Sequence, residues 1–305
     1  MTKLTGLIAA APTPFKVDGA LDLDRIPELV EHLLQDGVNG LYVLGSTGEG
    51  VSMTSDERRQ VAEKFIDVMK GRKPVIVQVG HLSVFESKNL AAHAASAGAD
   101  AISATPPGYF RPITMNALID SAAEIASQAP QLPFYFYSIP RLTGIDVDMT
   151  EFLEQAKERI PTLAGLKFTS HSVNEFHACL ELDRRRFDCL WGSDEMLLSA
   201  LAVGTRGMIG TTYNFAAPLY RQMIDHFQRG DLTAAQQLQS RAVAMIRVMI
   251  RSGGLPAFKA AMEFVGVSCG PVRLPLSTLS EADKKKLRQE LSRIGFFEWL
   301  SRNAA

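Results

Sequence analysis

The sequence predicts a (β/α)8 TIM barrel followed by a C-terminal helical extension. Eight short apolar segments alternate with amphipathic segments of helical period, and beyond Tyr213 the pattern is helical only. The connections between the apolar segments are of crossover length, which favours parallel pairing of the strands. An open, doubly wound sheet is the alternative, but no Gly-x-Gly-x-x-Gly motif follows any predicted strand.

The predicted strands are short apolar runs, most of them bounded by Gly, Pro or polar residues. Each is too short for a helix of ordinary length, and each is followed by a segment with helical periodicity. In chain order the strands are expected over 7–11, 40–44, 75–79, 101–104, 133–139, 163–168, 188–191 and 207–210.

The predicted helices carry recognisable start and stop signals. Thr54 and Glu57 have the spacing of a capping box, and Ser83 and Glu86 repeat it. Gly37 follows the first helical stripe, where a glycine commonly ends a helix. We expect residues 1–213 to form the barrel and 214–305 to pack on it as helices, the two making a single structural unit. Two helices are expected to begin after Thr54 and Ser83, the first with an apolar stripe that includes Phe65 and the second ended by Gly98. The other helices are expected at 26–34, 118–126, 149–158, 173–182, 196–202, 217–228, 233–250, 256–265 and 281–294.

The charge and cysteine content exclude several classes of protein. The chain has 305 residues, with 32 Lys plus Arg against 33 Asp plus Glu, so its formal net charge of −1 gives no reason to expect nucleic acid or an anionic membrane as a partner. The apolar run at 6–11 is too short for a signal peptide, and no stretch reaches membrane-spanning length. An odd number of cysteines without metal-type spacing predicts free thiols and no bound metal. We therefore expect a cytoplasmic protein with free Cys179, Cys189 and Cys269.

One lysine stands inside a predicted buried strand. Lys167 lies near the end of the run at 163–168, between Pro161 and Thr169. A buried cation is costly unless it is paired or loses its charge, and burial raises the neutral fraction of an amine. A neutral amine is what nucleophilic attack on a carbonyl requires. The segment is therefore compatible with a Schiff-base lysine, or with a lysine that pairs with a carboxylate or reaches solvent.

Polar and glycine-rich clusters follow several predicted strands at their carboxyl ends, where barrel enzymes carry their chemistry. The turn at 45–49 offers hydroxyls and backbone N–H groups to an anion, and Tyr137 offers a phenol for proton transfer. Asp194 and Glu195 could bind the hydroxyls of a polyol, or could complement the dipole of a following helix. Each cluster alone could also be an ordinary turn, and Tyr137 alone could be a packing residue, the role we expect for Tyr135.

These motifs together resemble the pyruvate-dependent class I aldolase family of dihydrodipicolinate synthase and N-acetylneuraminate lyase. The resemblance rests on Gly-Ser-Thr-Gly-Glu at 45–49, Tyr-Ser-Ile-Pro at 137–140 and Gly-Leu-Lys-Phe-Thr-Ser at 165–170. It implies a Schiff base on Lys167 without a cofactor, a proton-shuttling Tyr137, and a pyruvyl carboxylate held by Ser46 and Thr47. It further implies a homotetramer in which Tyr109 reaches the site of a partner subunit.

Within the family, the resemblance favours the lyase branch, which cleaves N-acetylneuraminate to pyruvate and N-acetylmannosamine. The synthase branch normally has an arginine where this chain has Leu142, and the neighbouring Arg141 is expected to point elsewhere. The alternatives are a synthase, another aldolase or dehydratase of 2-keto sugar acids, or a non-catalytic sugar-acid binding protein. The contacts implied for the sugar tail are Thr169, Gly192, Asp194, Glu195 and Thr211.

Overall fold

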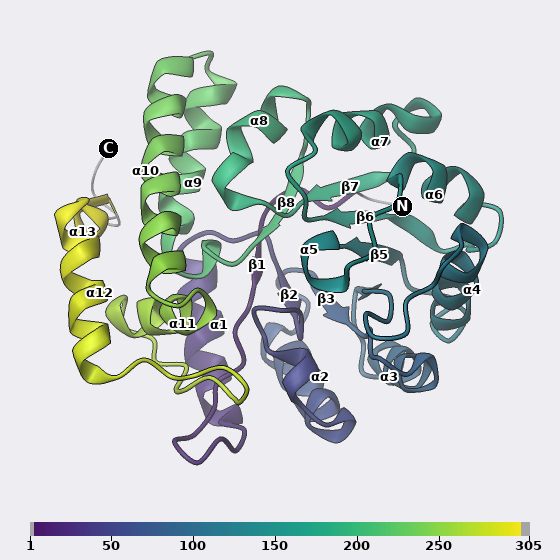
Figure 1. Ribbon diagram of the computed structural model, residues 1–305, viewed down its shortest axis with the longest axis horizontal. Coiled ribbons are helices and arrows are strands. Elements are labelled where there is room, and N and C mark those ends of the chain that lie inside the picture. The colour runs from purple at the N-terminus through teal and green to yellow at the C-terminus, as the bar shows by residue number, and fades with distance from the viewer. Residues whose placement is uncertain (1–2, 300–305) are drawn as a thin grey trace.

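The strands close into a barrel, as predicted. The computed structural model describes residues 3–299. All neighbouring strands are parallel, and β8 pairs with β1 to complete the circle (Figure 1). In chain order the strands are β1 (Gly6–Ala10), β2 (Gly40–Val43), β3 (Val75–Gln78), β4 (Ala101–Ala104), β5 (Phe134–Ser138), β6 (Leu163–Phe168), β7 (Asp188–Trp191) and β8 (Gly207–Gly210).

Helices follow the strands and form the outer layer of the barrel. The eight main ones are α1 (Ile26–Gln35), α2 (Ser55–Met69), α3 (Val84–Ser96), α4 (Met115–Ala126), α6 (Met149–Ala156), α7 (Val173–Arg185), α8 (Leu197–Ala202) and α9 (Tyr213–Gln228). The short helix α5 (Pro140–Thr143) was not predicted, because four residues carry no measurable periodicity. Three 3₁₀ turns, η1 (Leu23–Arg25), η2 (Gly50–Ser52) and η3 (Asp194–Met196), complete this part of the chain.

The C-terminal extension packs along one flank of the barrel. In Figure 1 its light-green and yellow helices stand beside α1 and α9. Since α9 also packs against β1, the helix that begins at Tyr213 connects the barrel and the extension. The extension comprises α10 (Leu232–Arg251), α11 (Leu255–Phe264), α12 (Glu281–Arg293) and α13 (Phe296–Trp299).

The two expected capping boxes differ in the structure. At the start of α2, the Thr54 hydroxyl accepts from the backbone N–H of Glu57 and the Glu57 carboxylate accepts from the backbone N–H of Thr54, so this box is complete. At the start of α3, Ser83 caps the helix, but the Glu86 carboxylate accepts from the Ser55 hydroxyl at 2.7 Å instead. The Ser55 hydroxyl, from another helix, has thus replaced the backbone N–H of Ser83 as the partner of the Glu86 carboxylate.

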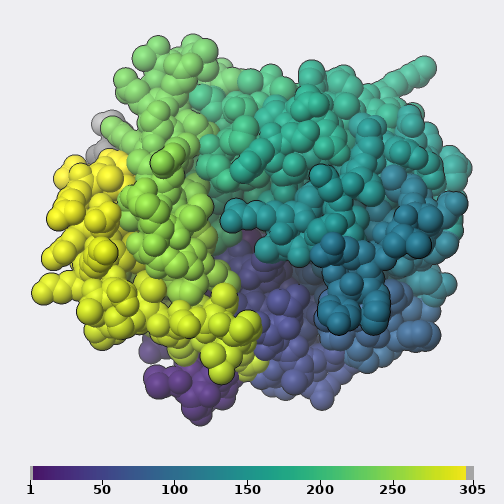
Figure 2. Space-filling view, viewed as in Figure 1, coloured from purple at the N-terminus to yellow at the C-terminus, as the bar shows by residue number. Residues whose placement is uncertain are grey.

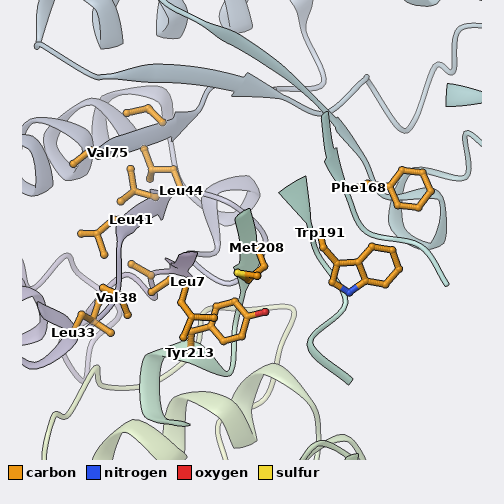
Figure 3. Close-up of a cluster of buried hydrophobic side chains, with 14 of the residues drawn as sticks. Leu7, Leu33, Val38, Leu41, Leu44, Val75, Phe168, Trp191, Met208 and Tyr213 are labelled. Atoms are coloured by element: carbon orange, nitrogen blue, oxygen red, sulfur yellow. The ribbon is translucent and has the colours of Figure 1, made fainter. Parts of the chain in front are cut away.

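Side chains of the strands alternate between two hydrophobic clusters. One set packs outward against the helices and includes Leu7, Leu41 and Met208, which Figure 3 shows beside Leu33 of α1 and Tyr213 of α9. The other set fills the inside of the barrel. Because side chains alternate along a strand, the register of neighbouring strands decides which inward residues meet. The inward set is Ile8, Ala10, Tyr42, Ile76, Ala101, Tyr135, Tyr137, Ile139, Ala164, Leu190 and Ile209.

Candidate active site

A cavity of about 870 Å³ opens at the carboxyl ends of the strands. In Figure 2 the surface is hollowed between the light-green C-terminal helices and the teal segments around α5. Active sites of parallel barrels lie at this end. The cavity collects all but one of the site residues predicted from the sequence, namely Ser46, Thr47, Tyr137, Lys167, Thr169, Gly192, Asp194, Glu195 and Thr211.

Lys167 and Tyr137 are direct register partners on neighbouring strands. Tyr137 of β5 pairs with Lys167 of β6, and both side chains contribute to the lining of the cavity. The amine Nζ lies 4.0 Å from the centroid of the Tyr137 ring. Strand register, rather than any local motif, therefore brings the phenol and the amine together.

The environment of Lys167 favours its neutral form. The residue is only 4% exposed, and within residues 3–299 its Nζ makes no hydrogen bond or ion pair. Burial lowers the pKa of Lys167 to about 7, and the nearby Asp194 carboxylate opposes this shift. At neutral pH a large fraction of this amine is unprotonated, as a nucleophilic lysine requires.

Tyr137 keeps its proton at neutral pH. Burial raises the pKa of its phenol, while the neighbouring hydroxyls of Ser46 and Thr169 act in the opposite direction. A neutral phenol beside an amine can donate a proton or pass one on. The position is distinct from that of Tyr135, whose hydroxyl donates to Asp188 Oδ2 at 2.8 Å and is engaged there.

The turn after β2 presents an anion-binding surface to the cavity. Within the described part of the chain, the backbone N–H groups of Ser46 and Thr47 have no hydrogen-bond partner. The Thr47 hydroxyl lies 2.7 Å from that of Thr211, which joins the turn to the end of β8. Free N–H groups on one turn, together with adjacent hydroxyls, suit a carboxylate.

Glu49, in the same motif, has a structural role. Its carboxylate is buried outside the cavity, where Oε1 accepts from Lys259 Nζ and Oε2 accepts from the backbone N–H of Arg273, both at 2.8 Å. The motif therefore also fastens the barrel to the C-terminal extension. The signal available in the sequence was a single lysine within the largely apolar segment of α11.

Asp194 and Glu195 occupy different depths of the cavity. Asp194 is buried; its Oδ2 accepts from the Thr212 backbone N–H at 2.8 Å and from the Thr212 hydroxyl at 2.6 Å. Its Oδ1 is buried and has no hydrogen-bond partner among residues 3–299. Burial raises the pKa of Asp194 to about 7, although the Thr212 hydrogen bonds lower it. Glu195 lies at the rim, with Oε1 3.1 Å from His171 Nε2.

A glycine is required at position 192 by close packing. A Cβ there would lie 2.1 Å from the Thr169 hydroxyl oxygen and 2.9 Å from the Phe168 carbonyl oxygen. The ends of β6 and β7 approach each other through this contact. Gly192 therefore shapes the cavity wall and leaves room for the Thr169 side chain.

Part of the cavity wall was missed by sequence reasoning. Arg141, which was expected to point elsewhere, contributes to the lining together with Leu142, because α5 lies across the mouth. The C-terminal extension supplies an apolar section. Helical periodicity shows which residues are buried but not whether they face a core or a cavity. The apolar residues from the extension are Ile246, Ile250, Leu255 and Phe258.

Tyr109 is the predicted site residue that does not line the cavity. It is 79% exposed, on the loop between β4 and α4, next to Phe110, which is 86% exposed. Their rings lie 5.1 Å apart in an edge-on arrangement. Two large aromatic side chains held together in solvent are typical of a surface that another molecule covers.

The three cysteines are free within residues 3–299, as predicted, and all three are buried. No cluster of His, Cys, Asp and Glu side chains within these residues has the arrangement of a metal site. Among their helices, none combines the length and apolar character needed to cross a membrane.

The fold and the site define a class of enzyme. A parallel barrel with a buried lysine beside a phenol at the carboxyl ends of its strands has the groups that a class I aldolase needs, and its relatives show that this protein belongs to that class of enzyme. The chain belongs to the dihydrodipicolinate synthetase family, whose sequence model matches residues 3–294. This confirms the resemblance drawn from the motifs around Ser46, Tyr137 and Lys167.

Individual relatives narrow the comparison. The N-acetylneuraminate lyase of Xenopus tropicalis is 41% identical over 285 residues, covering 92% of this chain and 93% of the relative. Among solved structures, the N-acetylneuraminate lyase of Proteus mirabilis superposes with a TM-score of 0.94 at 36% identity, covering 97% of this chain and 100% of that one. The N-acetylneuraminate lyase (sialic acid aldolase) of Aliivibrio salmonicida has the same TM-score at 38% identity, with coverages of 97% and 98%.

Proposed function

We propose that this protein is a Schiff-base aldolase that reversibly cleaves N-acetylneuraminate to pyruvate and N-acetylmannosamine. The observation that carries the proposal is that Lys167, with a pKa of about 7, shares one cavity with Tyr137 and the turn holding Ser46. The similarity to N-acetylneuraminate lyases over most of the chain supports the choice of substrate.

The reaction begins with attack of the neutral Lys167 amine on the C2 ketone of the open-chain sugar acid. Loss of the ketone oxygen as water leaves a protonated imine. When the C3–C4 bond breaks, its electron pair moves into this imine and gives a neutral enamine, so no free carbanion forms. Protonation of the enamine at C3 and hydrolysis of the imine then release pyruvate and restore the amine. The electron sink is built from the lysine itself, so the chemistry needs no cofactor.

Tyr137 moves the proton in this scheme. Its phenol takes the proton of the C4 hydroxyl, directly or through the substrate carboxylate, as C4 becomes the aldehyde of N-acetylmannosamine. The same proton is then available for the enamine. Ser46 and Thr47 hold the pyruvyl carboxylate through their hydroxyls and their unpaired backbone N–H groups. This arrangement keeps the carboxylate next to the phenol.

The sugar tail extends toward the rim of the cavity. Asp194 and Glu195 both line the cavity and carry carboxylates that can accept from sugar hydroxyls, and Glu195 lies closer to solvent. The apolar wall from α10 and α11 faces the carbon skeleton. The other proposed tail contacts are Thr169, Gly192 and Thr211.

The second candidate is a sibling reaction on the same imine, such as dihydrodipicolinate synthesis or the cleavage or dehydration of another 2-keto sugar acid. Leu142 disfavours the synthase, since it offers no charge for the carboxylate of an aldehyde substrate. The position of Arg141 favours the sibling reactions as a second candidate, because its cationic side chain lines the cavity. A non-catalytic sugar-acid binding protein would have no use for a buried amine whose pKa is lowered to about 7.

Borohydride trapping followed by a substrate panel tests the proposal. Incubation with pyruvate and borohydride is expected to add the mass of the reduced pyruvate imine at Lys167, and Lys167→Ala is expected to abolish both the adduct and turnover. Release of pyruvate from N-acetylneuraminate supports the lyase, whereas condensation of pyruvate with aspartate semialdehyde supports the synthase. Binding of the sugar acid without any adduct would identify a binding protein and refute the proposal.

We also propose a homotetramer in which Tyr109 reaches the site of a partner subunit. The exposed aromatic pair Tyr109 and Phe110 supports a contact between two copies of the chain.

A cytoplasmic location is proposed from the three free thiols, which fit a reducing compartment. We further propose that the barrel and the helices that follow it form a single structural unit; α9, which begins at Tyr213, packs on the barrel, and the extension begins with α10 at Leu232.

A further inference from the structure

A second aromatic ring lies against the amine of Lys167. Tyr42 of β2 has no exposed surface, and Lys167 Nζ lies 3.7 Å from the centroid of its ring. The Tyr137 ring lies 4.0 Å from the same nitrogen, and the two rings are 5.8 Å apart at an interplanar angle of 81°. The reacting nitrogen therefore rests on two aromatic faces, and Tyr42 has no role in the reaction scheme above.

The Tyr42 ring is held in place from two sides. Its hydroxyl donates to Ser103 Oγ on β4 at 3.1 Å. Gly45 packs against the ring edge, where a Cβ would lie 2.6 Å from Tyr42 Cε1. Burial raises the pKa of Tyr42 well above its ordinary value, so the ring stays uncharged. Tyr42 is thus a fixed, neutral ring that contacts the lysine from outside the cavity lining.

The face of an aromatic ring attracts a cation, and the attraction is stronger where water is excluded. In the proposed reaction, Lys167 Nζ carries a positive charge in the protonated imine. We propose that Tyr42 is a positioning residue whose ring face holds this nitrogen toward the substrate carbon and stabilises the charge on the imine. The inference rests on the proposed function, because this charge arises only if the imine forms.

The ionisable groups near Lys167 Nζ are compatible with this role of Tyr42. Asp194 is the carboxylate that favours a cation at Nζ, and its own pKa of about 7 leaves it partly protonated at neutral pH. Tyr137 is neutral at this pH. The charge of Arg58 on α2 lowers the pKa of Tyr42, against the larger effect of burial, and the Arg58 guanidinium donates hydrogen bonds to Gln78 and Gly80. The two ring faces therefore supply part of the stabilisation of the positive charge at Lys167 Nζ that a fully ionised carboxylate would otherwise provide.

A series of fluorinated side chains at position 42 tests the inference. Tyr42→Phe is compared with variants carrying 4-fluoro-, 3,5-difluoro- and 3,4,5-trifluorophenylalanine, since each fluorine weakens the negative ring face with little change in size. Tyr42→Phe, which keeps an unfluorinated ring and loses only the hydroxyl, is the reference against which kcat for N-acetylneuraminate cleavage is compared in the fluorinated variants. Across the series, kcat and the rate of borohydride trapping with pyruvate should fall together, by about 5- to 30-fold in total.

A purely structural role for Tyr42 predicts no graded response to fluorine. A flat series would therefore overturn the inference, and so would a loss in Tyr42→Phe as large as that of the whole series, which would assign the effect to the hydroxyl. Ser103→Ala is the matched control, because it removes the hydroxyl partner and leaves the ring; its kcat should stay within about threefold.

The same measurements separate this inference from the proposed function. If the unmodified protein forms no pyruvate adduct at Lys167, the proposed function fails and the inference fails with it. If the adduct forms and the fluorinated series is flat, the proposed function stands and only the role of Tyr42 is lost.

Discussion

Glu49 and Lys259 form an almost fully buried ion pair, with 2.8 Å between Oε1 and Nζ, although 210 residues separate them in the chain. Lys259 Nζ also donates to the Pro271 carbonyl at 2.7 Å and lies 4.2 Å from the centroid of the Phe15 ring. The pair joins the turn that carries Ser46 to α11. The pair therefore helps to hold two walls of the cavity together.

Removing the cation from this pair should destabilise the fold. In Lys259→Met the Glu49 carboxylate would stay buried without its charged partner, and we expect the free energy of unfolding to fall by about 3–5 kcal/mol. Denaturant unfolding at fixed protein concentration measures this. Lys284→Met is the matched control, since Lys284 pairs with Glu263 at the surface, where such pairs contribute about 0–1 kcal/mol. Equal losses in the two variants would contradict the role given to Lys259.

Loss of the Tyr137 hydroxyl should impair proton transfer but not imine formation. In Tyr137→Phe we expect kcat for N-acetylneuraminate cleavage to fall by about 10²–10⁴, with the pyruvate adduct at Lys167 still trapped by borohydride. Tyr135→Phe removes an equally buried hydroxyl that is bound to Asp188, so it should leave kcat near the wild-type value. Near-normal turnover in Tyr137→Phe would refute the assigned role.

The pH dependence of imine formation should follow Lys167. Its pKa of about 7 predicts that the rate of adduct formation rises as pH increases through 7, because the amine loses its proton there. The Asp194 carboxylate favours the charged amine and so raises this pKa. In Asp194→Asn the rising limb should therefore move to lower pH. Trapping rates with pyruvate, measured from pH 5 to 9, show the limb directly.

Glu195→Gln provides the control for this pH experiment. Glu195 lies at the rim beside His171, with about a third of its side chain exposed, so its charge is better screened. In Glu195→Gln the rising limb of the trapping rate against pH should stay within a few tenths of a pH unit of the wild-type limb. A shift of the Asp194→Asn limb to higher pH would show that the carboxylate does not stabilise the lysine cation.

The aromatic pair on the loop after β4 should control assembly. In Phe110→Asp a charge replaces a side chain that is 86% exposed beside Tyr109, and burying that charge against a second copy would be unfavourable. We expect light scattering coupled to size-exclusion chromatography to show a species smaller than a tetramer, with reduced turnover. Val17→Asp, at a residue equally open to solvent, should leave the mass unchanged. An unchanged mass for Phe110→Asp would place the subunit contact elsewhere.

Much of the architecture is encoded locally. The strands over 101–104, 163–168, 188–191 and 207–210 have the predicted bounds, because a short apolar run between turn residues has few other ways to be buried. The start of α2 followed from Thr54 and Glu57, whose reciprocal hydrogen bonds involve only near neighbours. The motifs around Ser46, Tyr137 and Lys167 likewise identified the chemical groups of the cavity.

Contacts between distant segments depended on closure of the barrel. Periodicity shows that Tyr42 is buried but not that its ring would meet Lys167, since that contact requires the curvature and register of several strands. The same holds for the wall supplied by Phe258 of the extension and for the placement of Arg141 by α5. The amino-acid sequence alone thus determined the fold class and pointed to Lys167 and Tyr137 as the groups to expect in the cavity. The tertiary structure decided the environment of Lys167, because the burial that lowers its pKa and the Asp194 charge that opposes this shift arise only when residues far apart in the chain enclose it.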